Sequence, residues 1–152
     1  IAFILIGGLT LFNRAQDVAN IQRAQQQILA LTASVKQLYA ATPNYVGLSN
    51  AVLINANAVP SDMLSAGAIV NIFAGAVTIG PGTGCNGTTG DFCITFQNVP
   101  DSACTQLVTG GGSGGFQEVK PNTGNWMIAP VSPDQAALRC NAGRSNTIIW
   151  LI

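Results

Sequence analysis

The N-terminal part of the chain carries a hydrophobic pattern with helical spacing. From Asn13 to Ala41 the apolar side chains recur every three or four residues, which places them on one helix face. These side chains are Val18, Ile21, Ala24, Ile28, Leu31, Val35 and Leu38. No Pro or Gly lies between Leu9 and Thr42, and Pro43 supplies a stop. The pattern predicts one helix over residues 1–42, about 60 Å long at 1.5 Å per residue.

Only part of so long a helix can be covered by a domain of this size. We expect residues 18–38 to pack on the rest of the chain and residues 1–12, which carry no charge, to protrude. The expected packing residues are Ile21, Ala24, Ile28, Leu31, Val35 and Leu38. Residues 1–12 would cover about 18 Å, whereas the hydrocarbon core of a bilayer is about 30 Å thick. They are therefore expected to be either a buried core helix or the second half of a longer apolar segment.

After Pro43 the pattern changes to short elements separated by turns. Apolar runs predict strands over 72–79, 92–97, 126–129 and 146–152. The last run is continuously apolar, which favours a place inside the sheet. Short helices are predicted over 49–55, 101–109 and 133–140. Asp101 is the expected N-cap of the second, and Ser132 opens the third within a capping box. Residues 60–67 and 110–116 read as loops. This order predicts an α+β fold with the long helix on one face of an antiparallel sheet.

Composition narrows the classes of function. Charged residues make up 8% of the chain, against roughly 25% in an average globular protein, and the formal net charge is zero. Such a surface has none of the basic character that nucleic-acid binding requires, so no nucleic acid is expected as a direct ligand. A weakly charged surface favours association. The composition therefore indicates a subunit of a larger assembly.

The chain has four cysteines and no histidine. The spacings between Cys85, Cys93, Cys104 and Cys140 do not fit a zinc site, and the lack of histidine removes the usual Cys/His sets. Two disulfides and an oxidising compartment are the better interpretation. Three pairings remain open. A bond between Cys85 and Cys93 would close a small loop, and no metal or cofactor is expected.

No group of residues has the arrangement that catalysis needs. The serines have no base partner, and the six carboxylates are scattered: Asp17, Asp62, Asp91, Asp101, Glu118 and Asp134. A carboxylate pair formed by folding is the remaining catalytic alternative. The glycine-rich residues 110–116 lack the lysine of a phosphate-binding loop. Asn86-Gly87-Thr88 is a glycosylation sequon, a triplet that is common by chance. The expected protein is therefore not an enzyme.

Three segments resemble a known family. They are LYAATPNYVGLSNAVLINANAVPSDM (38–63), IVNIFAGAVTIGP (69–81) and DSACTQLVT (101–109), supported by the position of Cys140. Together they resemble type IV pilins of the type IVb subclass, the bundlin-like major pilins. The resemblance implies a ladle shape, in which the helix of residues 1–42 is half embedded in a globular head, residues 43–152. It also implies a disulfide between Cys104 and Cys140 in the C-terminal region, which would leave Cys85 with Cys93.

The resemblance implies a structural subunit that polymerises with identical subunits into an extracellular pilus for adhesion, aggregation or conjugative contact. The subunit would sit in the inner membrane before the pilus assembly machinery extracts it. Filament-core packing would then fall to Ile1, Phe3, Ile4, Leu5, Ile6, Leu9, Leu11 and Phe12. The family's early glutamate has no counterpart before Asp17, which suggests that about a dozen residues precede Ile1, an estimate from the helix register.

Gly7 and Gly8 mark a weak point in this helix, since each glycine costs about 1 kcal/mol relative to alanine. We expect the helix to stretch or melt there in a filament, and a continuous helix in a filament map would contradict this. Close packing of helices at small residues is the alternative explanation. Two other functions stay open: a minor pilin or secretion pseudopilin, and a secreted binding module or enzyme with an unrelated anchor.

Overall fold

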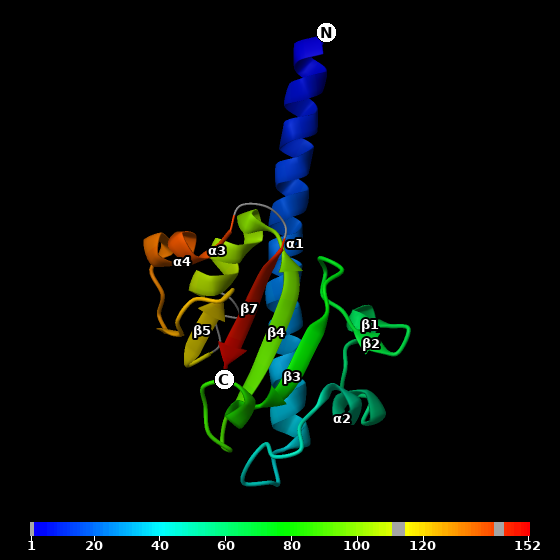
Figure 1. Cartoon of the computed structure of the whole chain (residues 1–152). Coiled ribbons are helices and arrows are strands. Elements are labelled where there is room, and N and C mark those ends of the chain that lie inside the picture. The colour runs from blue at the N-terminus through cyan, green and yellow to red at the C-terminus, as the bar shows by residue number, and fades with distance from the viewer. Residues whose placement is uncertain (1, 111–114, 142–144) are drawn as a thin grey trace.

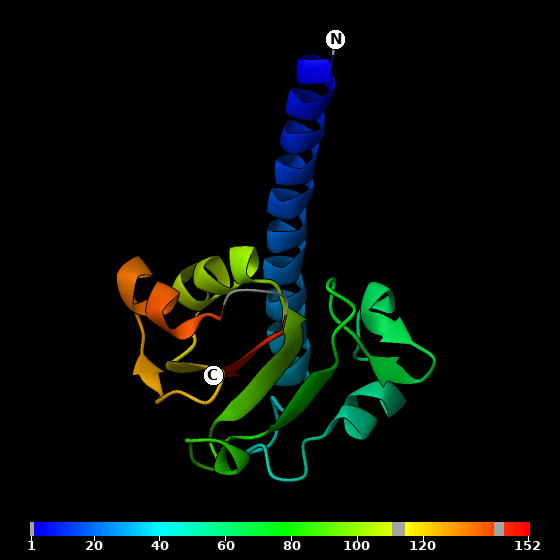
Figure 2. The same cartoon turned by 45° about the horizontal axis from the view of Figure 1, so that its top comes forward.

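The long N-terminal helix dominates the fold. The structure, a computed structural model, describes residues 2–110, 115–141 and 145–152, with side chains from residue 16 onward. Helix α1 (Ala2–Leu38) has 37 residues and projects far beyond the head at its N-terminal end. Its C-terminal part lies against one face of the sheet (Figures 1 and 2). None of the described helices combines the length and the hydropathy that crossing a bilayer requires.

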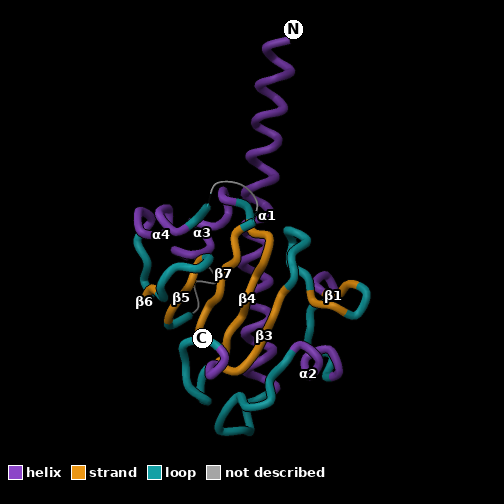
Figure 3. The backbone as a smooth tube through the Cα atoms, in the orientation of Figure 1, coloured by secondary structure: helices purple, strands orange, loops and turns teal. Residues whose placement is uncertain are grey.

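The head contains one antiparallel sheet of five strands in the order β3-β4-β7-β5-β6. Figure 3 shows these strands side by side. Their bounds are β3 Val77–Pro81, β4 Phe92–Val99, β5 Glu118–Pro121, β6 Met127–Ile128 and β7 Asn146–Leu151. The final strand lies at the centre, which confirms the prediction from its continuous apolar run. The predicted α+β fold with an antiparallel sheet is also confirmed.

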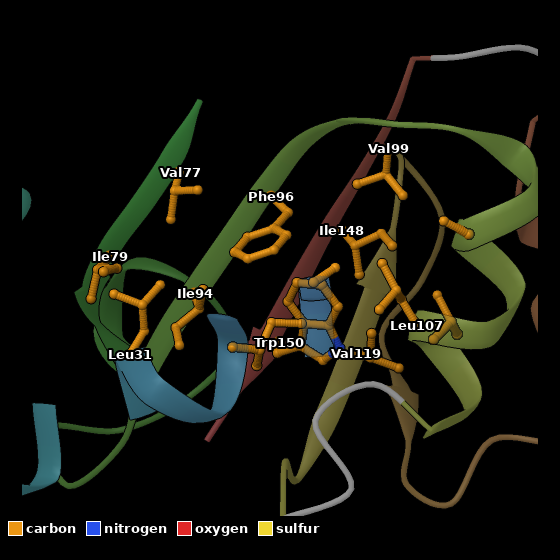
Figure 4. Packing of buried hydrophobic residues seen from close by; sticks show 14 of the residues in the cluster. Leu31, Val77, Ile79, Ile94, Phe96, Val99, Leu107, Val119, Ile148 and Trp150 are labelled. Carbon is orange, nitrogen blue, oxygen red and sulfur yellow. The ribbon is translucent and has the colours of Figure 1, made fainter. Parts of the chain in front are cut away.

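The core is formed between the sheet, α1 and the helix α3 (Asp101–Gly110). Figure 4 shows Leu31 of α1 directed at the sheet near Ile94. The rings of Phe96 and Trp150 pack edge to face, with centroids 5.4 Å apart and planes at 89°, an arrangement that aromatic pairs prefer. Leu107 of α3 closes the other side of the core beside Trp150 (Figure 4).

The segment between α1 and the sheet has more regular structure than its sequence predicts. Helix α2 (Asn50–Asn55) begins where predicted, with the Ser49 side chain accepting from the Val52 backbone N–H. The prediction of a loop over 60–67 was wrong. A 3-10 turn, η1 (Ser61–Met63), leads into a hairpin of β1 (Leu64–Ser65) and β2 (Ala68–Ile69). Its two turn residues both have positive φ, 50° at Ala66 and 77° at Gly67, as tight hairpin turns require.

Strand β3 begins five residues later than the predicted start at Ile72. Asn71 Oδ1 accepts hydrogen bonds from the backbone N–H groups of Phe73 and Gly75, at 2.9 and 3.1 Å. These bonds hold residues 71–75 in a turn. At Gly75 a Cβ would overlap the Gln97 carbonyl, so a side chain has no room there. Local side-chain bonding therefore overrides the alternating pattern that predicted a strand.

The outer edge of β3 is covered by one side chain of α2. Asn50 Nδ2 donates to the Val77 carbonyl at 2.7 Å, and Asn50 Oδ1 accepts from the Ile79 N–H at 2.8 Å. The amide thus pairs with the edge as a neighbouring strand would. Exposed edges of this kind otherwise invite pairing with another chain.

The C-terminal part of the head differs from prediction in three places. Strand β5 was not predicted at all. Asp101 is the first residue of α3 and accepts only from the neighbouring Ser102 N–H, so it is not the N-cap. Helix α4 (Pro133–Arg139) follows Ser132, whose side chain makes no capping bond. The Ser132 side chain is instead the main cause that lowers the pKa of the Asp134 carboxyl. The predicted linker 110–116 lies mostly outside the described residues.

Candidate functional site

The interface between α1 and the head, which we call the seam, is almost completely buried. Five of the six predicted packing residues are buried to 4% exposure or less: Ile21, Ala24, Ile28, Leu31 and Val35. The prediction was wrong for Leu38, which is 39% exposed because it ends the helix and lines an open groove with residues 56–60. Val18 is 51% exposed at the other end, where the helix leaves the head. The packed part of α1 is therefore shorter than predicted.

A buried polar residue orients the seam. Gln27 is 4% exposed. Its Oε1 accepts from the Ile72 N–H at 3.0 Å, and its Nε2 donates to Asp62 Oδ2 at 3.3 Å. Asp62 also forms an ion pair with Arg23 at 3.5 Å, in which both side chains are largely exposed. Because both ends of the buried Gln27 amide are hydrogen-bonded, burying it costs little free energy. The bonds hold the 60–72 segment in one position on the helix. The partners of Gln27 are far away in sequence, so the sequence analysis missed it.

The C-terminal region is joined by a disulfide between Cys104 of α3 and Cys140, directly after α4. This confirms the pairing that the family resemblance implies. Cys104 is fully buried, and the bond holds α4 against α3 (Figure 1). The bond closes a loop with a sequence separation of 36 residues. Such a closure stabilises a fold mainly by restricting the unfolded chain.

Next to this disulfide, the side chain of Asn146 forms a hydrogen-bonded centre. It has no exposed surface. Its Nδ2 donates to the carbonyls of Val99 at 3.1 Å and Asn141 at 3.0 Å. Its Oδ1 accepts from Asn122 Nδ2 at 2.9 Å and from the Asn141 N–H at 2.7 Å. The amide is saturated, so it joins β4, the β5–β6 turn and the segment after Cys140 to the start of β7. The sequence analysis did not identify it.

The second disulfide, between Cys85 and Cys93, closes the loop before β4. This loop also bonds to the start of β5 and the residue before it. Asn86 Nδ2 donates to Glu118 Oε2, and Gln117 Nε2 donates to Asp91 Oδ1. The amide of Asn86, the acceptor residue of the sequon, therefore already forms a hydrogen bond. The Thr88 hydroxyl is engaged too, 2.8 Å from Asp91 Oδ2. The loop is thus held by a disulfide and by hydrogen bonds to residues 117–118.

The pKa of Asp91 is lowered below 3.8, first by the backbone N–H of Thr88 and then by the side chains of Gln117 and Thr88. A carboxyl with a depressed folded pKa stabilises the fold above its unfolded pKa, and this contribution is lost as pH falls through the folded pKa. We therefore expect Asp91→Asn to lose less stability than the unchanged chain between pH 6 and pH 2.5. Urea denaturation at the two pH values measures this, with Asp17→Asn as the control. An unchanged pH dependence in Asp91→Asn would contradict it.

Except for Ile1, the predicted filament-core residues lie in the part of α1 for which only the backbone is described. Residues 2–38 form one helix, so Gly7 and Gly8 lie within it in the single chain. Ile1 lies outside the described residues. The filament-core roles of these residues and the opening of the helix at the two glycines stay predictions.

The described residues contain no group of three or more His, Cys, Asp or Glu side chains placed to hold a metal ion. The fold is asymmetric, because helix α1 projects far from a head that contains two disulfides. This arrangement can present an apolar helix for association while the head stays folded.

Known proteins with this arrangement are similar over most of the chain. The family described as PilS N terminal matches residues 18–152. The "Major structural subunit of bundle-forming pilus" of Escherichia coli O127:H6 (strain E2348/69 / EPEC) is 26% identical over 110 residues, which cover 71% of this chain and 56% of that protein. The same description and figures apply to a protein of Escherichia coli O111:H-. The chain thus spans a little over half the length of these relatives.

Solved structures agree with this match. A type IV b pilin from Salmonella typhi superposes with a TM-score of 0.68 at 27% identity, covering 84% of this chain and 95% of that one. TcpA, a type IV pilin from Vibrio cholerae El Tor biotype, gives a TM-score of 0.64 over 88% of this chain and 99% of that one. Its identity is 16%, so it supports the fold alone. The chain belongs to the PilS family of type IVb pilins.

Proposed function

We propose that this chain is the major structural subunit of an extracellular type IVb pilus, in which identical subunits polymerise through their N-terminal helices. The observation that carries the proposal is the charge-free start of α1, projecting from a disulfide-joined head of the PilS family. The relatives named as major structural subunits of the bundle-forming pilus support the choice of a major pilin. The proposed role is structural and not enzymatic.

The physical basis of polymerisation is transfer of apolar surface between two dry environments. Before assembly, the projecting helix and any apolar residues upstream of it would lie in the inner membrane. When the assembly machinery extracts the subunit, the apolar side chains would pack against helices of other subunits. Burial of apolar area then remains favourable outside the membrane. The helix satisfies its own backbone hydrogen bonds, so it can exist in lipid and in a filament core.

The proposal is tested in cells that produce the full-length protein. Filaments sheared from the cell surface are expected to contain this chain as their main protein by mass spectrometry. The variant Ile6→Asp is expected to reduce surface filaments at least tenfold, since a buried carboxylate without a partner is costly. Asn57→Asp, which adds the same charge at an exposed position of the head, is the matched control and should assemble normally. Filaments that contain only traces of the chain would indicate a minor pilin and overturn the proposal.

A pilus built in this way would connect cells by adhesion, aggregation or conjugative contact. A piliated strain is expected to form cell clusters that the Ile6→Asp strain does not form. Light microscopy of both strains at equal cell density measures this. Equal clustering in the two strains would remove cell contact from the proposal without affecting the structural role.

A further inference from the structure

The head is hollowed at the end where α1 emerges. A groove of about 600 Å³ lies between α1, the 71–75 turn and the start of α3. We call this the exit groove; the residues used below are Asp17, Ile72, Phe73, Asn98 and Asp101. A second hollow of about 370 Å³ shares Ala74 and Asn98 with it and continues toward β7. This end of the head is therefore concave over two adjoining surfaces.

The exit groove is acidic on its rim and apolar on one wall. Asp17 and Asp101 are exposed, and the described side chains include no ion pair with either of them. Arg14 precedes Asp17 by three residues in the sequence, on the projecting side of the helix. The apolar wall consists of Ile72, which is 37% exposed, and the half-buried Phe73. A complementary partner would carry a cation next to an apolar side chain.

The opposite end of the same head carries an exposed cation and an exposed apolar side chain. Helix α1 ends at Leu38, and residues 39–49 form a loop that projects at the end farthest from the N-terminus (Figure 1). We call these residues the tail loop. Lys36 is exposed in the last turn of α1. Val46 within the tail loop is 61% exposed. This end thus offers one exposed cation and one exposed apolar side chain.

We propose that the exit groove of one subunit receives the tail loop of a second copy of this chain, stacked head to tail along the direction of α1. Lys36 of the second copy then faces the carboxylates of Asp17 and Asp101, and Val46 packs on Phe73. This inference rests on the proposed function, because it describes a contact within the pilus. The two complementary surfaces lie at opposite ends of one head, so a contact between them cannot close a dimer. Stacked along α1, without a rotation that closes a ring, the contact builds an open filament.

The positions of the two charges make the contact testable. Asp17 and Lys36 lie on one straight helix, 19 residues apart, which is about 28 Å at 1.5 Å per residue. They cannot touch within one subunit. Any rescue of one charge change by the other must therefore act between subunits. A charge pair on the rim of an interface mainly orients the partners and excludes wrong registers.

The experiment exchanges the charges in the full-length protein and measures filaments sheared from the cell surface. Asp17→Lys alone and Lys36→Asp alone are each expected to reduce filament yield about tenfold, and the double variant should recover at least half of the original yield. Lys120→Asp, on strand β5 away from both surfaces, is the matched control and should leave the yield unchanged. Thermal unfolding of each variant verifies that the head is folded.

If an exchange unfolds the head, Asp17→Asn and Lys36→Gln remove the same charges and keep the side-chain shapes. Each is expected to reduce the yield about threefold, and the two together no further. Normal filaments in all single variants would overturn the inference and leave the proposed function intact. Loss of filaments in the single variants without recovery in the double variant would also overturn it. The proposed function itself fails if the unchanged chain forms no filaments, or if the filaments contain only traces of it.

Discussion

Replacing Cys104 and Cys140 together by alanine is expected to lower the free energy of unfolding by about 4 kcal/mol. The bond between them closes a loop with a sequence separation of 36 residues, and the entropy that a closure removes from the unfolded chain grows with loop length. The loss is a large part of the total stability of a domain, which is about 5–15 kcal/mol. Urea denaturation followed by tryptophan fluorescence measures it.

The second disulfide provides a matched control in the same chain. The bond between Cys85 and Cys93 spans a separation of only 8 residues, for which the same relation gives about 2.5 kcal/mol. Replacing Cys85 and Cys93 by alanine should therefore be the milder change. If removal of the shorter closure cost as much as removal of the longer one, loop entropy would not be the main source of stabilisation.

Leu31→Ala is expected to destabilise the head by about 3 kcal/mol, since large-to-small changes in a core cost 2–5 kcal/mol. Leu31 has no exposed surface and points from α1 to the sheet near Ile94 (Figure 4). Truncation leaves a cavity at the centre of the seam, where neither the helix nor the sheet can move to fill it. Urea denaturation of the purified chain measures the change.

Leu29→Ala is the control for this prediction. It makes the same chemical change on the same helix, two residues away, but Leu29 is 41% exposed. Its expected effect is within about 0.5 kcal/mol, as for surface substitutions in general. Equal losses in the two variants would show that helix propensity, and not packing on the head, determines the stability.

The sequence predicted those features that depend on the order of side chains along one element. Spacings of three and four residues located α1 and its packed face, and a continuous apolar run placed β7 inside the sheet. Leu38 was assigned wrongly because periodicity identifies a helix face but not the point at which the neighbouring surface ends. That point depends on where the sheet lies, which the sequence pattern does not contain.

The features that the sequence did not predict are mostly made by amide side chains. Gln27 bonds across 45 residues to the backbone of Ile72, and Asn146 bonds across 47 residues to the carbonyl of Val99. A local pattern treats such residues as solvent-exposed, since most asparagines and glutamines are. Their partners are brought close only by the completed fold. Of the candidate site, the family resemblance supplied the Cys104–Cys140 pairing, and the helical spacing of apolar side chains supplied most of the seam.

The Asn50 amide on the edge of β3 has a consequence for how such a protein polymerises. A subunit meant to assemble must reach high local concentrations, and a sheet with an open edge would then compete by adding strands and forming cross-β aggregates. Asn50 occupies the outward N–H of Ile79 and the outward carbonyl of Val77, and the strand at the other edge, β6, has only two residues. The head therefore offers almost no template for strand addition, and helix packing is left as the main route of growth.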